Sequence, residues 1–332
     1  MINIISENSG FVDSIFGNCQ APIKMFLMEN AEAWEKKSML EHLFLMGKSD
    51  KWSDVFTGLT ASSGFKPVGE NGAFPIDSMQ EGYKKQLVYK TWLDKFAVSR
   101  QLVEDDNIGA IKQMVQNFIK GYYRTRERLG AALYAGAISG KTSVQFEGDV
   151  FDIASADGVS LFHKAHKPKV KGDTQCNIFS DAFSVDALDR MESRMQLFRG
   201  ENNEILGMEP DTIVIANDPK LKRDVFAAIG ADKDPVTANN GFNYQYGRWN
   251  VIISSYLNEF VTKGAAPWIL MDSSYNKTVG GAVWNDRVDL DVDSYIDKDN
   301  NANIWSGYAR FNGTFNDWRF ACLGGAAAGN QL

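Results

Sequence analysis

Histidine and cysteine are scarce in this chain of 332 residues, which contains three of each. Three histidines supply few of the general bases on which most hydrolytic and transfer enzymes depend. Cys19, Cys176 and Cys322 are odd in number and far apart, so they form neither a zinc-ligand spacing nor a disulfide framework. The cysteine usage therefore favours a reducing compartment.

Long apolar runs and an excess of positive charge are also absent. No segment approaches the 20 or so apolar residues that a membrane helix needs, and the first residues are too polar for a signal peptide. The net charge is −7, which disfavours general nucleic-acid binding because phosphate contacts need lysine and arginine. Hydrophobic residues make up 44% of the chain, enough for a large core.

The longest regular pattern begins as a strand at Phe96 and continues as a helix from Asn107 to Tyr134. Glu104, Asp105 and Asp106 separate the two, and either aspartate can cap the helix. A helix of this length is roughly 40 Å long and typically forms a spine for other layers. Its predicted apolar stripe consists of Ile108, Ile111, Val115, Phe118, Tyr122, Leu129 and Leu133.

The residues before this helix predict an extended arm over 1–22, a helix over 25–46 and a short strand over 52–60. Glycine and proline punctuate residues 58–82, and a long β-like run follows over 83–100. We interpret this as a projecting hairpin, which is either a mobile surface loop or an arm that packs on a neighbouring subunit.

The remainder mixes helical and strand patterns without regular βαβ alternation, which indicates an α+β fold. The expected elements are a hairpin over 142–162, helices over 183–198 and 218–230, and strands over 211–216, 249–254, 267–271 and within 283–323.

Residues 136–142, GAISGKT, are one residue short of a phosphate-binding P-loop, because position 135 is alanine. They also follow a helix and precede a strand, the reverse of the order that a P-loop requires. The pattern therefore favours a glycine that ends the helix.

Asp297, Asp299, Asn301 and Asn303 resemble the start of a calcium loop. An EF-hand needs glycine and glutamate where this chain has Ala302 and Tyr308, so a solvated turn is favoured.

His163 and His166, with Asp157, Asp173 or Cys176, are the candidate zinc ligands. Four lysines at positions 164, 167, 169 and 171 oppose a bound cation, and an exposed basic loop that contacts phosphate or an acidic neighbour is the favoured interpretation. Neither a nucleophile elbow nor a dinucleotide fingerprint is present. We therefore predict no catalytic, cofactor-binding or metal-binding residue and no cofactor.

The order of these elements resembles the major capsid proteins of tailed bacteriophages with the HK97 fold, and within them the Mu-type major head subunits. The resemblance covers roughly residues 50–325. It is carried by FAVSRQLVEDDNIGAIKQM, RERLGAALYAG, ADGVSLFHKAHK, the stretch SVDALDRMESRMQLFRGENNEILGMEPDTIVIANDPKLKRDVF and residues 249–270.

This resemblance implies a structural protein, not an enzyme, whose copies form pentamers and hexamers of an icosahedral shell around double-stranded DNA, without sequence-specific binding. The implied segments are an N-terminal arm and helix (1–50), an extended loop (55–98), a peripheral domain (99–180, with the spine helix at 106–135), an axial domain (181–270) and a return to the peripheral domain with a tail (271–332).

The implied location is the virion, after synthesis in the host bacterial cytoplasm, and the implied partners are scaffolding, portal and decoration proteins. Some relatives crosslink through lysine and asparagine, but nothing pairs Lys84 or Lys85 with a particular asparagine, so no crosslink is predicted. Two alternatives remain: an encapsulin-like nanocompartment shell, which shares the fold, and an α+β metabolic enzyme or binding module, which would be a small oligomer with a pocket.

Overall fold

The computed structural model describes residues 38–60, 65, 67–70, 72–74, 76, 80–104, 108–230, 242–261, 266–299 and 301–325. Within them, helices and strands build two separate four-stranded sheets and two small hairpins. This is the predicted α+β fold. The expected arm, most of the expected helix over 25–46 and the acidic cap residues Asp105 and Asp106 lie outside the described residues.

The first sheet has the strand order β1-β10-β11-β4. Its two central strands are long and antiparallel, and β1 pairs with β10 in parallel. The bounds are β1 Leu45–Lys48, β4 Lys90–Val98, β10 Ala282–Ile296 and β11 Asn303–Phe315. The strand β1 corrects the expected helix through Met46, because the described helical turn there, α2, spans only Leu40–Leu43. Backbone pairing with β10 outweighs the local helical pattern of these residues.

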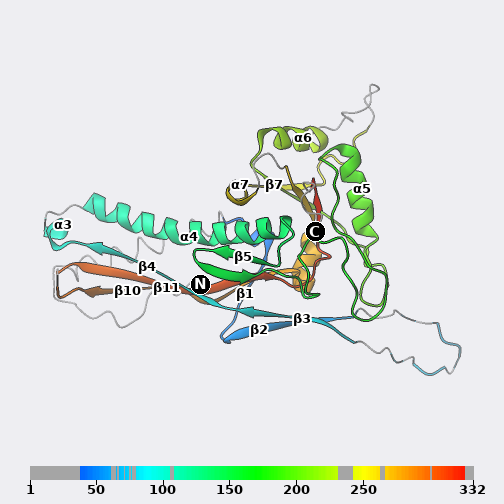
Figure 1. Ribbon diagram of the computed structural model, residues 1–332, viewed down its shortest axis with the longest axis horizontal. Coiled ribbons are helices and arrows are strands. Elements are labelled where there is room, and N and C mark those ends of the chain that lie inside the picture. The colour runs from blue at the N-terminus through cyan, green and yellow to red at the C-terminus, as the bar shows by residue number, and fades with distance from the viewer. Residues whose placement is uncertain are drawn as a thin grey trace.

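The helix α4, Ile108–Ile138, lies along one face of this sheet (Figure 1). Its 31 residues span about 46 Å. Five predicted stripe residues are buried: Ile111, Val115, Phe118, Leu129 and Leu133. The contact is close enough that a Cβ atom on Gly307 of β11 would lie 2.6 Å from the Phe118 ring. The short helix α3, Arg100–Glu104, links β4 to the region before α4.

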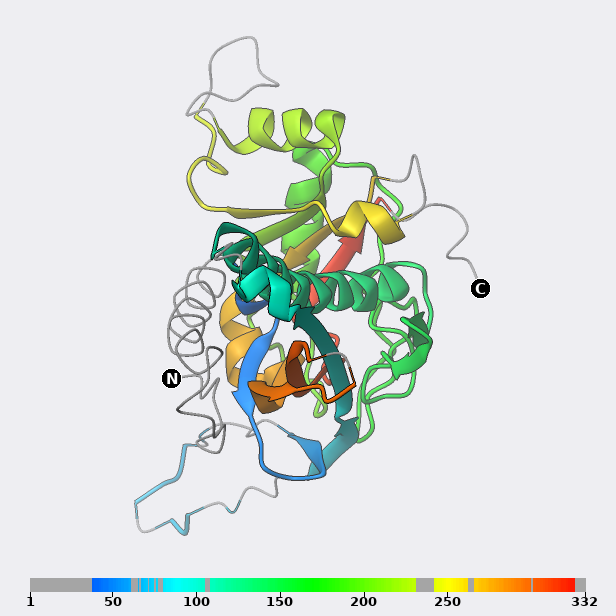
Figure 2. The ribbon, with the colours of Figure 1, turned by 90° about the vertical axis from the view of Figure 1, so that its left-hand side faces the viewer.

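The second sheet has the strand order β12-β9-β7-β8, with bounds β7 Thr212–Ala216, β8 Asn250–Ser254, β9 Trp268–Met271 and β12 Ala321–Gly324. The strands β7 and β8 are parallel, and β9 is antiparallel to both of its neighbours. The helices of this region are α5 Val185–Gln196, α6 Pro219–Ile229 and α7 Leu257–Phe260. In both ribbon views α4 lies between the two sheets (Figures 1 and 2).

Side-chain caps begin both longer helices of the second sheet. Ser184 accepts a hydrogen bond from the Ala187 N–H at the start of α5, and Asp218 accepts one from the Leu221 N–H at the start of α6. Such caps satisfy N–H groups of the first turn that have no partner within the helix. The turn of α8, Ser273–Tyr275, and the π-helix η1, Asn276–Gly280, connect β9 to β10.

Two hairpins complete the fold. In the larger one, β2 Ser53–Leu59 pairs with β3 Glu81–Val88, and in the smaller one β5 Ser143–Phe146 pairs with β6 Asp149–Asp152. The strands of the β2–β3 hairpin lie below the first sheet in the view of Figure 1, and the described residues of the loop between them lie away from the body. The expected continuous strand over 83–100 is divided at Tyr89, because β3 pairs with β2 whereas β4 pairs with β11.

Candidate functional site: the base and tip of the β2–β3 hairpin

The P-loop-like residues form the end of α4 and a turn. Gly136 lies inside the helix, and Gly140 has a positive φ of 71° just beyond its end. The Lys141 N–H donates to the carbonyl of Gly136, which satisfies a free carbonyl of the last turn. The favoured interpretation, a glycine that ends the helix, is confirmed.

The calcium-like residues lie at the turn between β10 and β11. Asp297 Oδ1 accepts the Asp299 N–H at 3.1 Å, and the Asp297 N–H donates to the carbonyl of Ala302 at 2.9 Å. Asn303 is already the first residue of β11. Both hydrogen bonds lie within the turn. This agrees with the interpretation of these residues as a turn, which the sequence favoured.

The two neighbouring histidines, His163 and His166, have different environments. The interpretation of this segment as an exposed basic loop is therefore only partly correct. The lysines at 164, 167, 169 and 171 are exposed, but His166 has 0% exposure. Its ring nitrogens contact Asp157 and Asn177, and His163 Nδ1 accepts the Ala165 N–H. Among the described residues, no three His, Cys, Asp or Glu side chains gather as a metal site.

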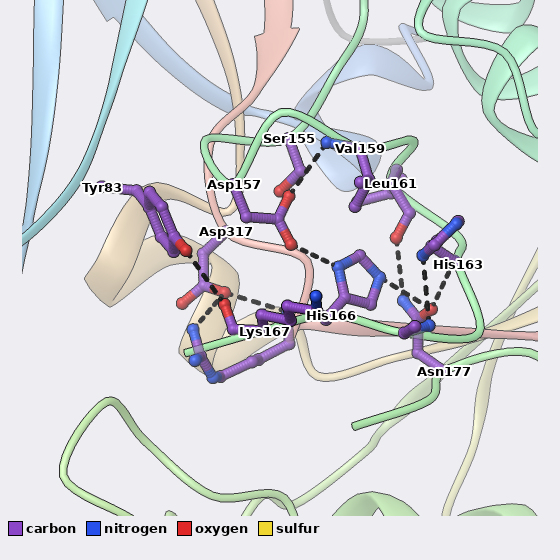
Figure 3. A network of polar contacts seen from close by, with 12 residues as sticks. Tyr83, Ser155, Asp157, Val159, Leu161, His163, His166, Lys167, Asn177 and Asp317 are labelled. Carbon is purple, nitrogen blue, oxygen red and sulfur yellow. Dashed lines mark hydrogen bonds and ion pairs between the residues drawn. The ribbon is translucent and has the colours of Figure 1, made fainter. Parts of the chain in front are cut away.

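His166 is the centre of a buried polar cluster (Figure 3). Its Nδ1 lies 2.6 Å from Asp157 Oδ2, and its Nε2 lies 3.2 Å from Asn177 Oδ1. The ring stacks on Trp318 with a centroid distance of 4.2 Å and an interplanar angle of 10°. The sequence spacing suggested only a ligand or a loop residue, because the partner Trp318 is distant in the chain.

The segment that carries His166 also contacts β3 near the loop end of the β2–β3 hairpin. The hydroxyl group of Tyr83 donates to the carbonyl of Lys167 at 3.2 Å (Figure 3). Lys169 Nζ donates to the carbonyl of Gly82 at 2.8 Å. A cavity of about 320 Å³ lies beside these contacts, between Tyr83, Glu201 and Arg319.

Ion pairs attach β3 and the first residue of β4 to the smaller hairpin. Lys85 is 6% exposed and its Nζ lies 2.7 Å from Asp152 Oδ2. Lys90 pairs with Asp149 at 3.4 Å. Lys84, in contrast, is exposed and pairs with Glu81 of its own strand. The side chain of Lys85 therefore has a partner inside the chain.

Tyr89, at the junction of β3 and β4, anchors the hairpin from the other side. Its hydroxyl group donates to Asp54 of β2, and Asn285 Nδ2 donates to the same carboxylate. Burial alone would raise the pKa of Asp54, but hydrogen bonds from Tyr89, Ser49 and Asn285 outweigh it and hold this pKa below its usual value. The base of the hairpin is thus fixed by polar side chains.

The tip of the hairpin has the opposite character. Phe65, Phe74 and Ile76 are 109%, 94% and 96% exposed, and Val68 is 55% exposed. Large apolar side chains exposed in this way are typical of interaction surfaces. Glycine and proline in this segment predicted the projection, but its apolar tip was not singled out from the sequence.

Another buried polar contact involves Arg126 of α4, which is not one of the predicted apolar stripe residues. Its guanidinium makes two hydrogen bonds to Asp286 of β10, at 2.8 and 2.9 Å. Burial lowers its pKa, but Tyr122 and Asp286 outweigh burial and the pKa lies above its usual value. No local signal could reveal a partner 160 residues away.

The chain is thus an α+β protein with two four-stranded sheets, a long helix and exposed apolar side chains at the tip of a hairpin. A protein-family model described as "Phage capsid protein" matches residues 90–323. The chain belongs to this phage capsid protein family. It is accordingly a structural protein of the virion capsid and not an enzyme, and the encapsulin-like alternative is not favoured.

Solved capsids share the fold at low sequence identity. The chain is similar to the capsid of an empty GTA particle, with a TM-score of 0.53 and 15% identity over 88% of this chain and 90% of that one. It is also similar to the capsids of cyanophage P-SCSP1u (TM-score 0.51, 10% identity, covering 87% and 88%) and Ralstonia phage GP4 (TM-score 0.51, 11% identity, covering 87% and 91%). These likenesses confirm the HK97-like fold. No curated protein matches the chain.

Among the described residues, no helix is both long enough and apolar enough to cross a membrane.

Proposed function

We propose that copies of this chain close into an icosahedral shell of pentamers and hexamers around double-stranded phage DNA, joined in part by the tip of the β2–β3 hairpin. The observation that carries this proposal is the nearly complete exposure of Phe65, Phe74 and Ile76 on a projection. Apolar side chains that are exposed to water have an unfavourable free energy of hydration. Burial of these side chains against a partner surface would remove that cost. A second copy of the chain is the partner that a shell provides.

The domain assignment follows the segments that the resemblance implies. We assign α4, β10 and β11 to a peripheral domain, 99–180 and 271–332, whose sheet is completed by β1 and β4 from the two preceding segments. We assign β7, β8, β9, α5 and α6 to an axial domain, 181–270. We assign most of the hairpin to the extended loop, 55–98, and residues 1–50 to the N-terminal arm and helix. The last strand, β12, pairs with β9, so residues 321–324 form the edge strand of the axial sheet.

The acidic net charge supports packaging without tight or sequence-specific DNA binding. In this proposal the protein is made in the host bacterial cytoplasm and meets scaffolding, portal and decoration proteins during assembly.

The first test is electron microscopy and light scattering of the purified chain and of a tip variant, Phe74→Asp with Ile76→Asp. We expect closed shells or capsomers from the unaltered chain. The variant should stay folded, because both side chains are exposed, but should lose assembly because charge replaces the apolar contact.

The matched control is Phe74→Leu with Ile76→Leu, which keeps the tip apolar and should still assemble. Assembly of both variants with equal yield would show that the tip is not a contact between copies. If the chain stays monomeric under crowding and in the presence of a candidate scaffolding protein, the proposal that it forms a shell is wrong.

A further inference from the structure

Residues 242–246, FNYQY, show an inverted pattern of burial between α6 and β8. The three aromatic side chains are exposed, with Phe242 at 82%, Tyr244 at 50% and Tyr246 at 51%. The two amide side chains between them are buried, with Asn243 at 4% and Gln245 at 0%. A loop that meets only water is expected to show the opposite order, because water solvates amides better than aromatic rings. Exposed rings of this kind are typical of interaction surfaces.

The buried amides hold this aromatic loop, residues 242–246, against two helices. Asn243 Nδ2 donates to the carbonyl of Ala228 in α6 at 2.7 Å. Gln245 Nε2 donates to Asp189 and Glu192 of α5 at 2.7 and 3.0 Å. A loop that is already fixed loses little conformational entropy when a partner covers its rings, so the aromatic loop is prepared for binding.

A groove of about 530 Å³ lies beside α5. Its lining includes the aromatic side chains of Phe179 and Trp268 and the guanidinium groups of Arg190 and Arg194. Arg194 lies over the Phe179 ring at 5.1 Å, and Arg190 pairs with Asp181 at side-chain exposures of 64% and 48%. Aromatic walls and exposed guanidinium groups together bind aromatic side chains, through ring packing and cation–π contacts.

The aromatic loop and the α5 groove lie on different sides of the helix. At 3.6 residues per turn, Glu192, which contacts the loop, points to the opposite side of α5 from Arg190 and Arg194, which line the groove. Asp189 lies between these two sides. Because its amides fix the loop in place, its rings do not reach the groove of their own chain. Two different surfaces on one chain fit a head-to-tail contact, which closes into a ring when the rotation between copies allows it.

We propose that the aromatic loop of one copy binds the α5 groove of a second copy and so joins the second sheets of neighbouring copies into a ring. The partner is a second copy because the chain is a capsid protein, and a capsid is built from many copies of its subunit. The two surfaces are also complementary, since ring faces of negative potential meet two guanidinium groups. This contact rests on the proposed shell and adds to it a second joint, separate from the hairpin tip.

Crosslinking of the full chain tests the contact. The double variant Tyr246→Cys with Ser193→Cys places one thiol in the aromatic loop and one in the lining of the groove. The background carries Cys19→Ser and Cys176→Ser, whereas Cys322 is fully buried and stays. A short bismaleimide added under assembly conditions should give a ladder of covalent oligomers up to pentamers and hexamers on a denaturing gel. The matched controls are the two single variants, in which one new thiol per copy allows no oligomer beyond a dimer.

Lysines in the aromatic loop give a second measurement that needs no crosslink. Phe242→Lys with Tyr246→Lys should stay folded, because both side chains are exposed, but should weaken association of copies about tenfold or more, because the new charges meet Arg190 and Arg194. The matched control, Phe242→Leu with Tyr246→Phe, keeps the loop apolar and should associate like the unaltered chain. Sedimentation velocity over a range of concentrations measures association, and circular dichroism checks the fold.

The results separate this contact from the proposed shell. Closed shells of the double-cysteine variant without a ladder, or a lysine variant that associates like the unaltered chain, would overturn the contact between loop and groove and leave the shell. A ladder without closed shells would refute the shell and leave the contact. A chain that gives neither ladder nor assembly would refute both.

Discussion

Two arginines on α4, separated by one residue, show how burial decides the effect of a charge. Arg126 pairs with Asp286 at side-chain exposures of 10% and 12% and lies within 5.5 Å of the Tyr122, Trp284 and Phe311 rings. Arg128 pairs with Glu147 and Glu259 at exposures of 29% to 55%. The first pair is screened little by salt, whereas water and salt reach the second.

Arg126→Met should destabilise the chain by about 3–5 kcal/mol, because Asp286 would remain buried without a counter-charge. Urea denaturation would measure this difference. Arg126→Met combined with Asp286→Leu should recover much of the loss, since both charges are then removed. A single variant as stable as the unaltered chain would show that Asp286 finds another partner.

Tyr122 gives a prediction for alkaline pH. Burial raises its pKa from 10.0 to about 12, and the nearby Arg126 charge opposes the rise only in part. The unfolded chain therefore loses this proton before the folded chain does, so stability falls as the pH rises from 10 towards 12. Two pH units correspond to about 2.7 kcal/mol for this group.

Tyr122→Phe should flatten the fall of stability over that pH range relative to the unaltered chain, measured by denaturation at matched pH values. The other buried tyrosines with raised pKa values, Tyr134 and Tyr275, contribute equally to both proteins. Parallel curves for the two proteins would contradict the role of Tyr122.

At the scale of the element, α4 meets the first sheet through Phe118. The ring is 7% exposed, lies 5.1 Å from the Phe96 ring and covers Gly307 of β11. Phe118→Asp should prevent folding, because a buried charge there has no partner. Met114→Asp, one turn earlier at 37% exposure, is the control and should remain soluble. Thermal melting and solubility measure both, and a soluble Phe118→Asp with unaltered melting would refute the assigned packing.

Most elements of this chain are determined by residues that are close together in the sequence, so they could be predicted from it. The apolar stripe of α4, the caps at Ser184 and Asp218 and the Glu147–Gly148 turn each depend on a few neighbouring residues. The turn residues have φ values of 47° and 88°, the left-handed conformation that the hairpin needs. The strand β1 and the break at Tyr89 could not be predicted in this way, because pairing with β10, β2 and β11 determines them.

At the scale of the whole molecule, Arg128 links the two sheets. It joins α4 to Glu259 of α7, which follows β8, and to the Glu147 turn. Hydrogen bonds to Glu259 are the main reason that its pKa is raised. Because these groups are exposed, Arg128→Gln should cost less than about 1 kcal/mol, and the cost should vanish near 1 M salt. Denaturation at low and high salt would check this, and a salt-independent loss would contradict it.

The sequence by itself determined the α+β class, the spine helix, the projecting hairpin and the resemblance to phage capsid proteins, because these depend on local periodicity and on the order of elements. Only the tertiary structure decided that Arg126 and His166 are buried and that the hairpin has a polar base and an apolar tip. The physical reason is that burial depends on distant partners: Asp286 and Trp318 lie 160 and 152 residues away from Arg126 and His166.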